Sequence, residues 1–401
     1  MSVIFVKERG IRCFSGIAKL TIVLFSVAMA TAFIESIWAV YMNQLIGKVS
    51  TISFLSAFFT ILAFFSFFMI VPIVAKYRKS ILAMYALFLT GMAYFLFSIS
   101  KNLYFFIFLA CFMSFLLSLR ITVFGLIVRD RSSRKQISRN QGFVYSFLNL
   151  AWLIGPLVAG YLASWYGIPL VFILASVFVF FSLILFKIFK IDDGNTVKKV
   201  ENPFRNFLNF FKKKERVMAY ILRGGLVFWF ILIYLYTPIL IIRSGFGTIE
   251  VGYFLFAFSV PLIALEYLFS KITPKLGFRK MFKTAFLILA IIGIICFFVF
   301  ESIYILLGLL VLSGIACAIL EPMTEAYFFR VLGKKEELKY YGPYNTAAET
   351  SLIAAKILAG MLLLWLSFRF LFLFFAFFMF VYFLIASRMK EVKDKTRKNG
   401  K

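Results

Sequence analysis

Long runs of apolar residues, separated by short polar segments, recur along the whole chain. Each run approaches or exceeds the roughly 20 residues that a helix needs to cross a bilayer. Strands of a membrane barrel would instead alternate apolar and polar residues over about ten positions. We therefore predict twelve transmembrane helices, at residues 18–45, 51–75, 81–99, 104–128, 141–165, 168–189, 217–242, 249–271, 281–300, 303–329, 341–366 and 369–388.

Composition supports an all-α integral membrane protein. The chain has 401 residues, of which 63% are hydrophobic and 15% are charged, whereas soluble domains have roughly 45 to 50% apolar and about 25% charged residues. The first apolar run follows a long basic stretch and has no small-residue cleavage site, so we expect a retained span and not a signal peptide. A multi-pass protein of the plasma membrane is predicted.

The net charge of +27 is distributed unevenly between the two sides of the predicted membrane. Of the 44 Lys and Arg residues, 37 fall in the termini and in alternate loops on one side. Such an excess marks the cytoplasmic side, so both termini are predicted to be cytoplasmic. The charge then meets anionic lipids, and nucleic acid is not an expected partner. The other side carries Lys48, Lys101, Arg243 and Arg369, and the spans contain Arg120, Arg223 and Lys356.

The spans form two sets of six that resemble each other. A shift of about 200 residues aligns residues 139–160 with residues 339–360 and places Gly142 on Gly342 and Gly160 on Gly360. Parallel six-helix repeats of this kind build one large class of transporters. We predict an N-terminal six-helix bundle, a cytoplasmic linker, a C-terminal six-helix bundle and a basic cytoplasmic tail, at residues 1–189, 190–216, 217–388 and 389–401.

The linker contains a short amphipathic pattern. Asn202 and Pro203 are typical of a helix N-cap and first turn. Apolar residues then recur at helical spacing before a run of lysines, which predicts an interfacial helix on the cytoplasmic leaflet. A simple tether with incidental phenylalanines is the alternative. The apolar residues are Phe204, Phe207, Leu208 and Phe211.

Several short motifs resemble those of the major facilitator superfamily. The fifth span contains IGPLVAGYLASWYG, which is similar to the glycine-proline motif of its antiporters, and the fourth span contains Arg120, similar to the family's intramembrane arginine. The loops VPIVAKYRKS and TPKLGFRK resemble its basic turns. The resemblance implies that spans one, four, seven and ten line a cavity that opens alternately to each side. The motif residues are Arg78, Lys79, Gly155, Pro156, Gly160, Gly277, Arg279 and Lys280.

Five carboxylates fall within predicted spans, namely Glu35, Glu266, Glu321, Glu325 and Glu349. Each carboxylate, when charged at a helix centre, raises the free energy of membrane insertion by about 2.5 to 3.5 kcal/mol. The carboxylates therefore do not help the helices to enter the bilayer, and their presence needs another explanation.

Four charged residues lie on helices that the resemblance assigns to the cavity: Glu35, Arg120, Glu321 and Glu325. Glu321 and Glu325 share a helix face. The repeat places Arg120 at the depth of Glu321, which predicts an ion pair and leaves Glu325 for a mobile proton or a cationic substrate. We assign the four to proton coupling. The alternative is that the acids only join helices by pairing with bases.

Further residues are predicted to contact substrate, because an aromatic ring beside a carboxylate suits a lipophilic cation. Packing or an interfacial aromatic belt is the alternative for any single ring. These candidates are Trp38, Tyr41, Trp229, Tyr234, Tyr236, Tyr327, Glu349 and Lys356.

The chemistry that the sequence lacks narrows the function. The chain has no histidine, its four cysteines are scattered, and it has no phosphate-binding loop, so neither a metal nor another cofactor is expected and ATP-driven pumping is disfavoured. We predict a monomeric secondary transporter of a small molecule. The favoured function is proton-coupled export of lipophilic or cationic compounds. A facilitative or proton-coupled importer of sugars, peptides or lysolipids is the alternative. A lipid scramblase or a membrane-embedded enzyme is disfavoured.

Overall fold

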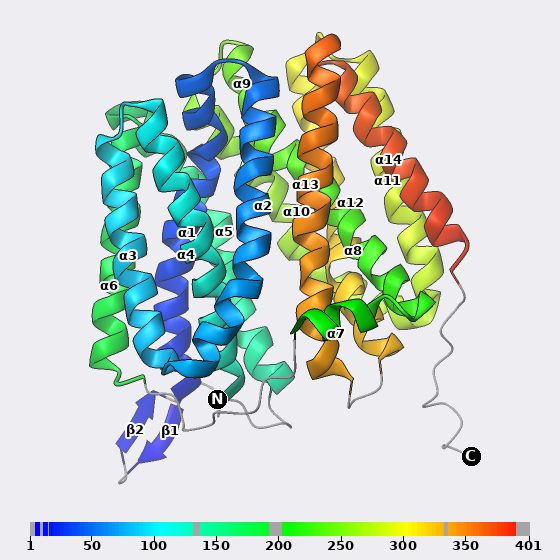
Figure 1. Cartoon of the computed structure of the whole chain (residues 1–401). Coiled ribbons are helices and arrows are strands. Elements are labelled where there is room, and N and C mark those ends of the chain that lie inside the picture. Colours follow the sequence, from blue (N-terminus) through cyan, green and yellow to red (C-terminus); the bar gives the residue numbers. More distant parts are fainter. Residues whose placement is uncertain are drawn as a thin grey trace, which may run out of the picture. The chain divides into compact units, whose positions relative to one another are not determined.

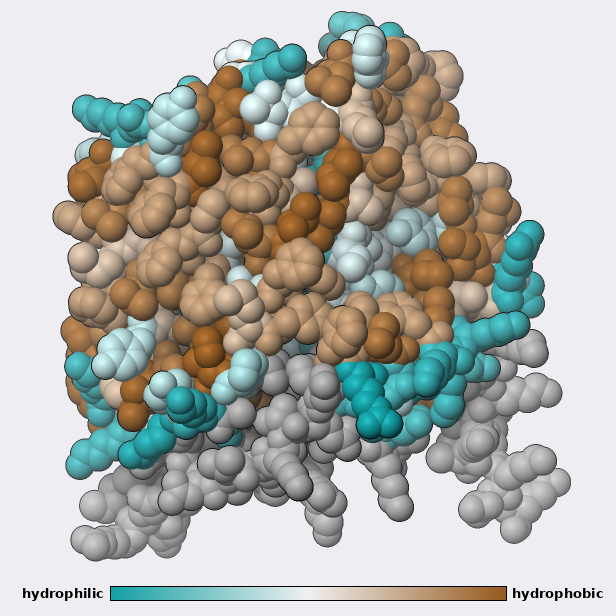
Figure 2. Space-filling model, in the orientation of Figure 1, coloured by the Kyte–Doolittle hydropathy of each residue, from teal (hydrophilic) through white to brown (hydrophobic). Residues whose placement is uncertain are grey.

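The computed structural model describes residues 5–8, 11–14, 16–130, 137–191, 203–332 and 336–389. Within these residues, twelve helical segments are long and apolar enough to cross a membrane. Their ends lie within a few residues of the predicted ones, which confirms the all-α membrane fold. On the face shown in Figure 2, brown hydrophobic side chains cover most of the middle, and teal hydrophilic ones gather toward the upper and lower edges, as expected for a membrane protein.

The first half begins with a short antiparallel pair of strands, β1 (Phe5–Glu8) and β2 (Ile11–Phe14), which was not predicted. Six long helices follow (Figure 1): α1 (Gly16–Ile46), α2 (Val49–Lys76), α3 (Lys79–Ile99), α4 (Leu103–Asp130), α5 (Ile137–Tyr166) and α6 (Ile168–Ile188).

The second half opens with the short helix α7 (Pro203–Phe210), which lies where the linker helix was predicted. The seventh span consists of α8 (Lys214–Ile231), a π-helical segment η1 (Leu232–Tyr236) and α9 (Thr237–Arg243). The remaining helices are α10 (Thr248–Leu276), α11 (Phe278–Phe298), α12 (Ile303–Val331), α13 (Glu337–Trp365) and α14 (Phe370–Ser387).

The chain forms two compact units. Unit 1 contains Met1–Lys48, Phe58–Glu201 and Pro238–Phe256. In it α1 packs against α5 and α6, and α3 packs against α4 and α6. Phenylalanine and tyrosine rings fill the space between these helices, so apolar contact holds unit 1 together.

Unit 2 contains Val49–Ala57, Asn202–Thr237 and Ala257–Lys401. Helix α11 packs against α12 and α14, and α8 packs against α12, α13 and α14. Helix α7 packs against α13, and its buried Phe210 contacts the rings of Tyr220 and Tyr340. Phe204 and Leu208 of α7 stay exposed. The bundle limits at residues 189 and 217 remain a prediction, as does the placement of α7 on a membrane surface.

Candidate functional site

Three carboxylates from two helices of unit 2 lie within electrostatic reach of one another. Glu321 and Glu325 are one turn apart on α12, and Glu266 comes from α10. The side chains of Glu266 and Glu321 are partly buried, whereas that of Glu325 is 39% exposed. Three acids in a membrane-spanning region repel one another unless cations or protons neutralise them.

Arg223 of α8 is the base that faces this cluster. Its Nη1 lies 3.5 Å from Oε1 of Glu325, and its guanidinium lies over the ring of Tyr344, 4.7 Å from the centroid. Tyr344 is fully buried on α13 and stacks on Phe328 of α12 at 3.9 Å. Buried Nε of Arg223 has no hydrogen-bond partner among the described residues. A carboxylate and a ring therefore hold Arg223 between three helices.

A fourth carboxylate of unit 2, Glu349, also lies near Arg223. Glu349 of α13 lies within electrostatic reach of both Lys356 and Arg223. Lys356 donates a hydrogen bond to the backbone carbonyl of Ser56 at 3.3 Å. Arg223 is the base within electrostatic reach of Glu321 and within 3.5 Å of Glu325. We call Glu266, Glu321 and Glu325 the acid cluster, and a proton or a cationic group would offset charge that the arginine leaves unpaired.

Proline interrupts the hydrogen-bond ladder of α12 inside the acid cluster. Pro322 lies within the helix directly after Glu321, and because it has no N–H, the carbonyl of Ala318 loses its usual partner. The hydroxyl of Thr324 donates to the carbonyl of Glu321 at 3.0 Å. The backbone of α12 is thus more polar at the acid cluster than in an uninterrupted spanning helix.

The seventh span is irregular at the predicted aromatic site. Tyr234 and Tyr236 lie in η1, and π-helical segments occur frequently at functional sites. Tyr236 is fully buried and its hydroxyl is 2.8 Å from the Ser53 hydroxyl, whereas Tyr234 is partly buried against Phe258.

The other two aromatic candidates of unit 2 are also packed. Trp229 is fully buried and donates from Nε1 to the Ser313 hydroxyl at 3.0 Å. Tyr327 is buried against Phe278 and Phe282. Packing accounts for Trp229, Tyr236 and Tyr327, and Tyr234 also packs edge-on against Phe230 and Phe258, so substrate contact by any of the four stays a prediction.

Unit 1 holds a second polar group around Arg120 of α4. The side chain is 5% exposed, and its Nη2 donates to the Thr31 hydroxyl of α1 at 3.0 Å. The other terminal nitrogen, Nη1, has no partner among the described residues. Tyr94 of α3 lies within electrostatic reach of both Arg120 and Glu35. Glu35 is exposed and follows Thr31 by one turn, so it shares a helix face with the arginine's partner.

The predicted pair of Arg120 with Glu321 joins residues of different units and stays a prediction. The ion pair that the structure forms at the acid cluster is that of Arg223 with Glu325. Glu325, assigned from sequence to a mobile proton, therefore has a basic partner in this structure, and Glu321 has only the more distant influence of Arg223.

Two aromatic candidates of unit 1 belong to its packed interior. Tyr41 is 7% exposed and donates to the carbonyl of Ser100 at 2.9 Å. Trp38 packs against Phe97 and Phe106. These contacts account for both side chains without a bound ligand.

The glycine motif makes close helix contacts. A Cβ on Gly155 would lie 2.5 Å from Cβ of Ala32, so the motif lets α5 approach α1. A Cβ on Gly160 would lie 2.7 Å from the carbonyl oxygen of Thr248, and one on Gly252 would lie 2.6 Å from that of Pro156. Residues 156–160 thus bring the backbones of α5 and α10 into contact within unit 1.

The basic motif residues flank turns between helices. Arg78 is exposed before α3, and Lys79 is the first residue of that helix. Gly277 precedes α11 with a φ of 84°, a left-handed conformation that favours glycine. Arg279 and Lys280 follow in the first turn of α11, where both are exposed.

Sequence reasoning missed several members of these polar groups. Glu266 satisfied the same criterion as Glu321, a carboxylate in an apolar span, but its helix is not one that the resemblance assigns to the cavity. Arg223 was counted among the bases of the spans without a role. For Tyr344, Tyr94 and Thr31, no local pattern signals contact with an arginine on another helix.

Comparison with known families decides the class of protein. The model of the Major Facilitator Superfamily matches residues 20–282 and 238–401. The chain belongs to the Major Facilitator Superfamily. It is a multi-pass membrane transporter of that superfamily.

One curated relative is the "Bicyclomycin resistance protein homolog" of Haemophilus influenzae, which is 26% identical over 174 residues. The match covers 41% of this chain and 43% of that relative, so the chain spans less than half of the relative's length.

Solved structures share the fold at low sequence identity. A POT family transporter in complex with 5-aminolevulinic acid has a TM-score of 0.76 at 15% identity and covers 96% of this chain and 97% of its own. A peptide transporter POT in complex with alafosfalin has a TM-score of 0.74 at 15% identity, with coverages of 95% and 96%. A bacterial homologue of the iron transporter ferroportin, in its inward-facing state, has a TM-score of 0.66 at 12% identity, with coverages of 93% and 97%.

Proposed function

We propose that this superfamily member is a secondary transporter that uses a proton gradient to export small lipophilic or cationic compounds by alternating access. The observation that carries the proposal is the acid cluster, in which Glu266, Glu321 and Glu325 lie within electrostatic reach of one another and Arg223 pairs with Glu325. An excess of carboxylates within membrane-spanning helices can exchange a proton for a cation. The chain has no histidine, so carboxylates are the groups suited to this proton traffic.

The relative named for bicyclomycin resistance supports export, because resistance to a compound is a natural result of its removal from the cell. The solved structures with peptide-like ligands share only the fold, and import of such compounds becomes an outcome of the test. We further propose a monomer in the plasma membrane with both termini in the cytoplasm, no resident cofactor, no catalytic activity and no nucleic-acid partner. A small molecule and anionic lipids are the proposed partners.

The test is flux in proteoliposomes with an imposed pH gradient. Bicyclomycin, tetraphenylphosphonium and alafosfalin are suitable probes of a drug, a lipophilic cation and a peptide-like compound. We expect a gradient to drive at least one of the first two, and Glu321→Gln or Glu325→Gln to lower that flux at least tenfold, because neither amide can exchange a proton. Glu301→Gln is the matched control, since Glu301 is an exposed carboxylate in the loop before α12.

Three results would count against the proposal. Equal flux with and without the gradient would indicate facilitated diffusion. Flux of alafosfalin alone would favour the importer. Full gradient-driven flux in the Glu321→Gln/Glu325→Gln double variant would remove the acid cluster from the mechanism. Size-exclusion elution of every variant shows whether a loss of flux comes from misfolding.

A further inference from the structure

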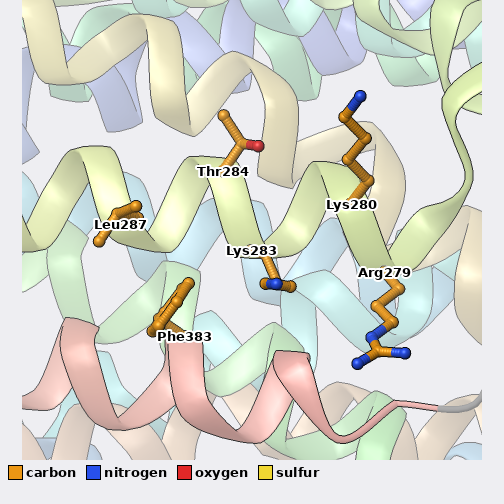
Figure 3. A pocket seen from close by; sticks show the side chains of 6 residues that line it. All are labelled: Arg279, Lys280, Lys283, Thr284, Leu287 and Phe383. Carbon is orange, nitrogen blue, oxygen red and sulfur yellow. The ribbon is translucent and has the colours of Figure 1, made fainter.

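Helices α11 and α14 of unit 2 flank a basic groove that has no part in the acid cluster. The groove has a volume of about 480 Å³ and is lined by six residues, none of them acidic (Figure 3): Arg279, Lys280, Lys283, Thr284, Leu287 and Phe383. Three of the six are basic, so the groove attracts anions.

The lining residues follow one side of the first turns of α11. In Figure 3, Arg279 and Lys283 lie toward α14, whereas Lys280 and Thr284 extend along the opposite edge of α11. The ammonium group of Lys283 lies 5.6 Å from the ring centroid of Phe383, a distance that permits a cation–π contact. Arg279, Lys280 and Thr284 are exposed, so their polar groups are accessible to a ligand.

The groove changes from polar to apolar along α11. Arg279 is the second residue of the helix, and Leu287 lies eight residues further. At 1.5 Å per residue, the two are separated by about 12 Å along the helix axis. The polar region of each leaflet is only about 5 to 8 Å thick, so bases at the helix start reach headgroup depth while Leu287 lies at acyl-chain depth. Leu287 is 37% exposed, and Phe383 completes the apolar end.

We propose that this groove binds one anionic phospholipid of the cytoplasmic leaflet. Arg279 and Lys283 would bind the phosphate oxygens, Lys280 and Thr284 would contact the headgroup from the other edge of α11, and Leu287 and Phe383 would contact the first acyl carbons. A free phosphate would satisfy the basic end alone and would leave the apolar end without a partner. The order of polar and apolar side chains therefore favours a lipid as the occupant.

The first repeat offers a natural control. The turn at Arg78 and Lys79 corresponds to that at Arg279 and Lys280, but Leu82 stands where the shift of 201 residues places Lys283. The first repeat thus has the two bases of the turn without the third base one turn deeper. A variant that loses three bases there, Lys76→Gln/Arg78→Gln/Lys79→Gln, changes the net charge as much as the groove variant does.

Native mass spectrometry of the detergent-purified full chain tests the proposal. Dioleoyl phosphatidylglycerol is the probe, and dioleoyl phosphatidylcholine, with the same acyl chains, is the neutral comparison. We expect one tightly retained phosphatidylglycerol. Because each base near an anionic headgroup contributes about fivefold in affinity, Arg279→Gln/Lys280→Gln/Lys283→Gln should weaken retention on the order of 100-fold. The first-repeat variant should keep the wild-type affinity at this site.

Two further measurements separate a lipid site from other sources of the signal. Inorganic phosphate at millimolar concentration should not displace the lipid, and Leu287→Asn, which adds no charge, should weaken retention although all three bases remain. The single variant Lys283→Gln, expected to weaken retention about fivefold, serves if the triple variant fails to fold. Equal retention of both lipids, displacement by phosphate, or wild-type retention in Lys283→Gln would overturn the proposal. Transport is not measured, so failure of the proposed function leaves this test unaffected.

Discussion

The guanidinium of Arg223 has a carboxylate on one side and an aromatic ring on the other. Each contact limits the side chain differently, because the carboxylate attracts the charge and the ring fixes the plane of the group. The side chain of Arg223 is 21% exposed and that of Glu325 is 39% exposed, so solvent weakens their attraction. We therefore expect a moderate coupling, larger than that of a surface pair and smaller than that of a fully buried one.

A double-mutant cycle with Arg223→Gln and Glu325→Gln measures this coupling. We expect about 1 kcal/mol from thermal unfolding in detergent, and Arg223→Lys should restore only part of it because lysine cannot stack on Tyr344 as a planar fork. Lys213 and Glu336 provide the control, since they pair at 3.3 Å with side chains 57% and 36% exposed. That cycle should give a few tenths of a kcal/mol. Equal coupling in the two cycles would contradict the role given to Tyr344.

The acid cluster shows which residues a sequence can reveal. Glu321 and Glu325 could be found because an acid in an apolar span is costly and a spacing of four places two acids on one face. The partner could not be found in the same way. Arg223 lies on α8, a hundred residues before Glu325, and the repeat pointed to Arg120 instead. Contacts between helices depend on how each is rotated in the bundle, which hydropathy does not report.

At the scale of elements, two helix contacts repeat across the halves of the chain. In unit 1, Gly160 of α5 meets the backbone of α10 at Thr248 and Gly252, and the Thr248 hydroxyl donates to the carbonyl of Gly160 at 3.0 Å. In unit 2, a Cβ on Gly360 of α13 would lie 3.1 Å from Cβ of Ser53 on α2. The predicted match of Gly160 with Gly360 therefore has one physical basis, a glycine where a neighbouring helix approaches closely.

Alanine substitution at these glycines tests the close approach. In Gly160→Ala, the new methyl group would lie 2.7 Å from a backbone oxygen, so α5 and α10 must separate. We expect a loss of about 1 to 3 kcal/mol, measured as a lower unfolding temperature in detergent. Gly308→Ala is the control, because nothing lies within 4 Å of the position on α12, and alanine there should stabilise the helix by up to about 1 kcal/mol. An undiminished unfolding temperature in Gly160→Ala would contradict the contact.

Helix positions followed from hydropathy because every predicted span must satisfy its backbone hydrogen bonds internally and expose apolar side chains to lipid. The π-helical segment Leu232–Tyr236 could not be predicted from hydropathy. A π-bulge adds one residue to a turn and leaves an apolar stretch equally apolar, so its signature is absent from hydropathy. The hydroxyl of Thr237 donates to the carbonyl of Leu232 at 2.7 Å, which compensates for part of the disturbed backbone pattern.

At the scale of the whole molecule, charge decides orientation. Cytoplasmic loops of membrane proteins carry an excess of Lys and Arg, and only four of the 44 bases fall in loops of the opposite predicted side. One of those four, Arg243, donates to the amide oxygen of Asn43 and to the carbonyl of Gly47. These hydrogen bonds give Arg243 a structural reason to lie at that end of α9. Its presence on the outer side is therefore only weak evidence against the predicted orientation. The termini should therefore lie in the cytoplasm.

Cysteine accessibility tests this orientation in a background whose four native cysteines are replaced by alanine. Lys101→Cys lies between α3 and α4, on the predicted outer side, and Lys212→Cys lies between α7 and α8, on the predicted cytoplasmic side; both positions are exposed in the structure. A membrane-impermeant maleimide applied to intact cells should label Lys101→Cys at least tenfold more than Lys212→Cys, and disruption of the membrane should make the two equal. Stronger labelling of Lys212→Cys than of Lys101→Cys would show the opposite orientation in the membrane. It would also place the groove of α11 and α14 in the outer leaflet, where the positive surface would meet less anionic lipid.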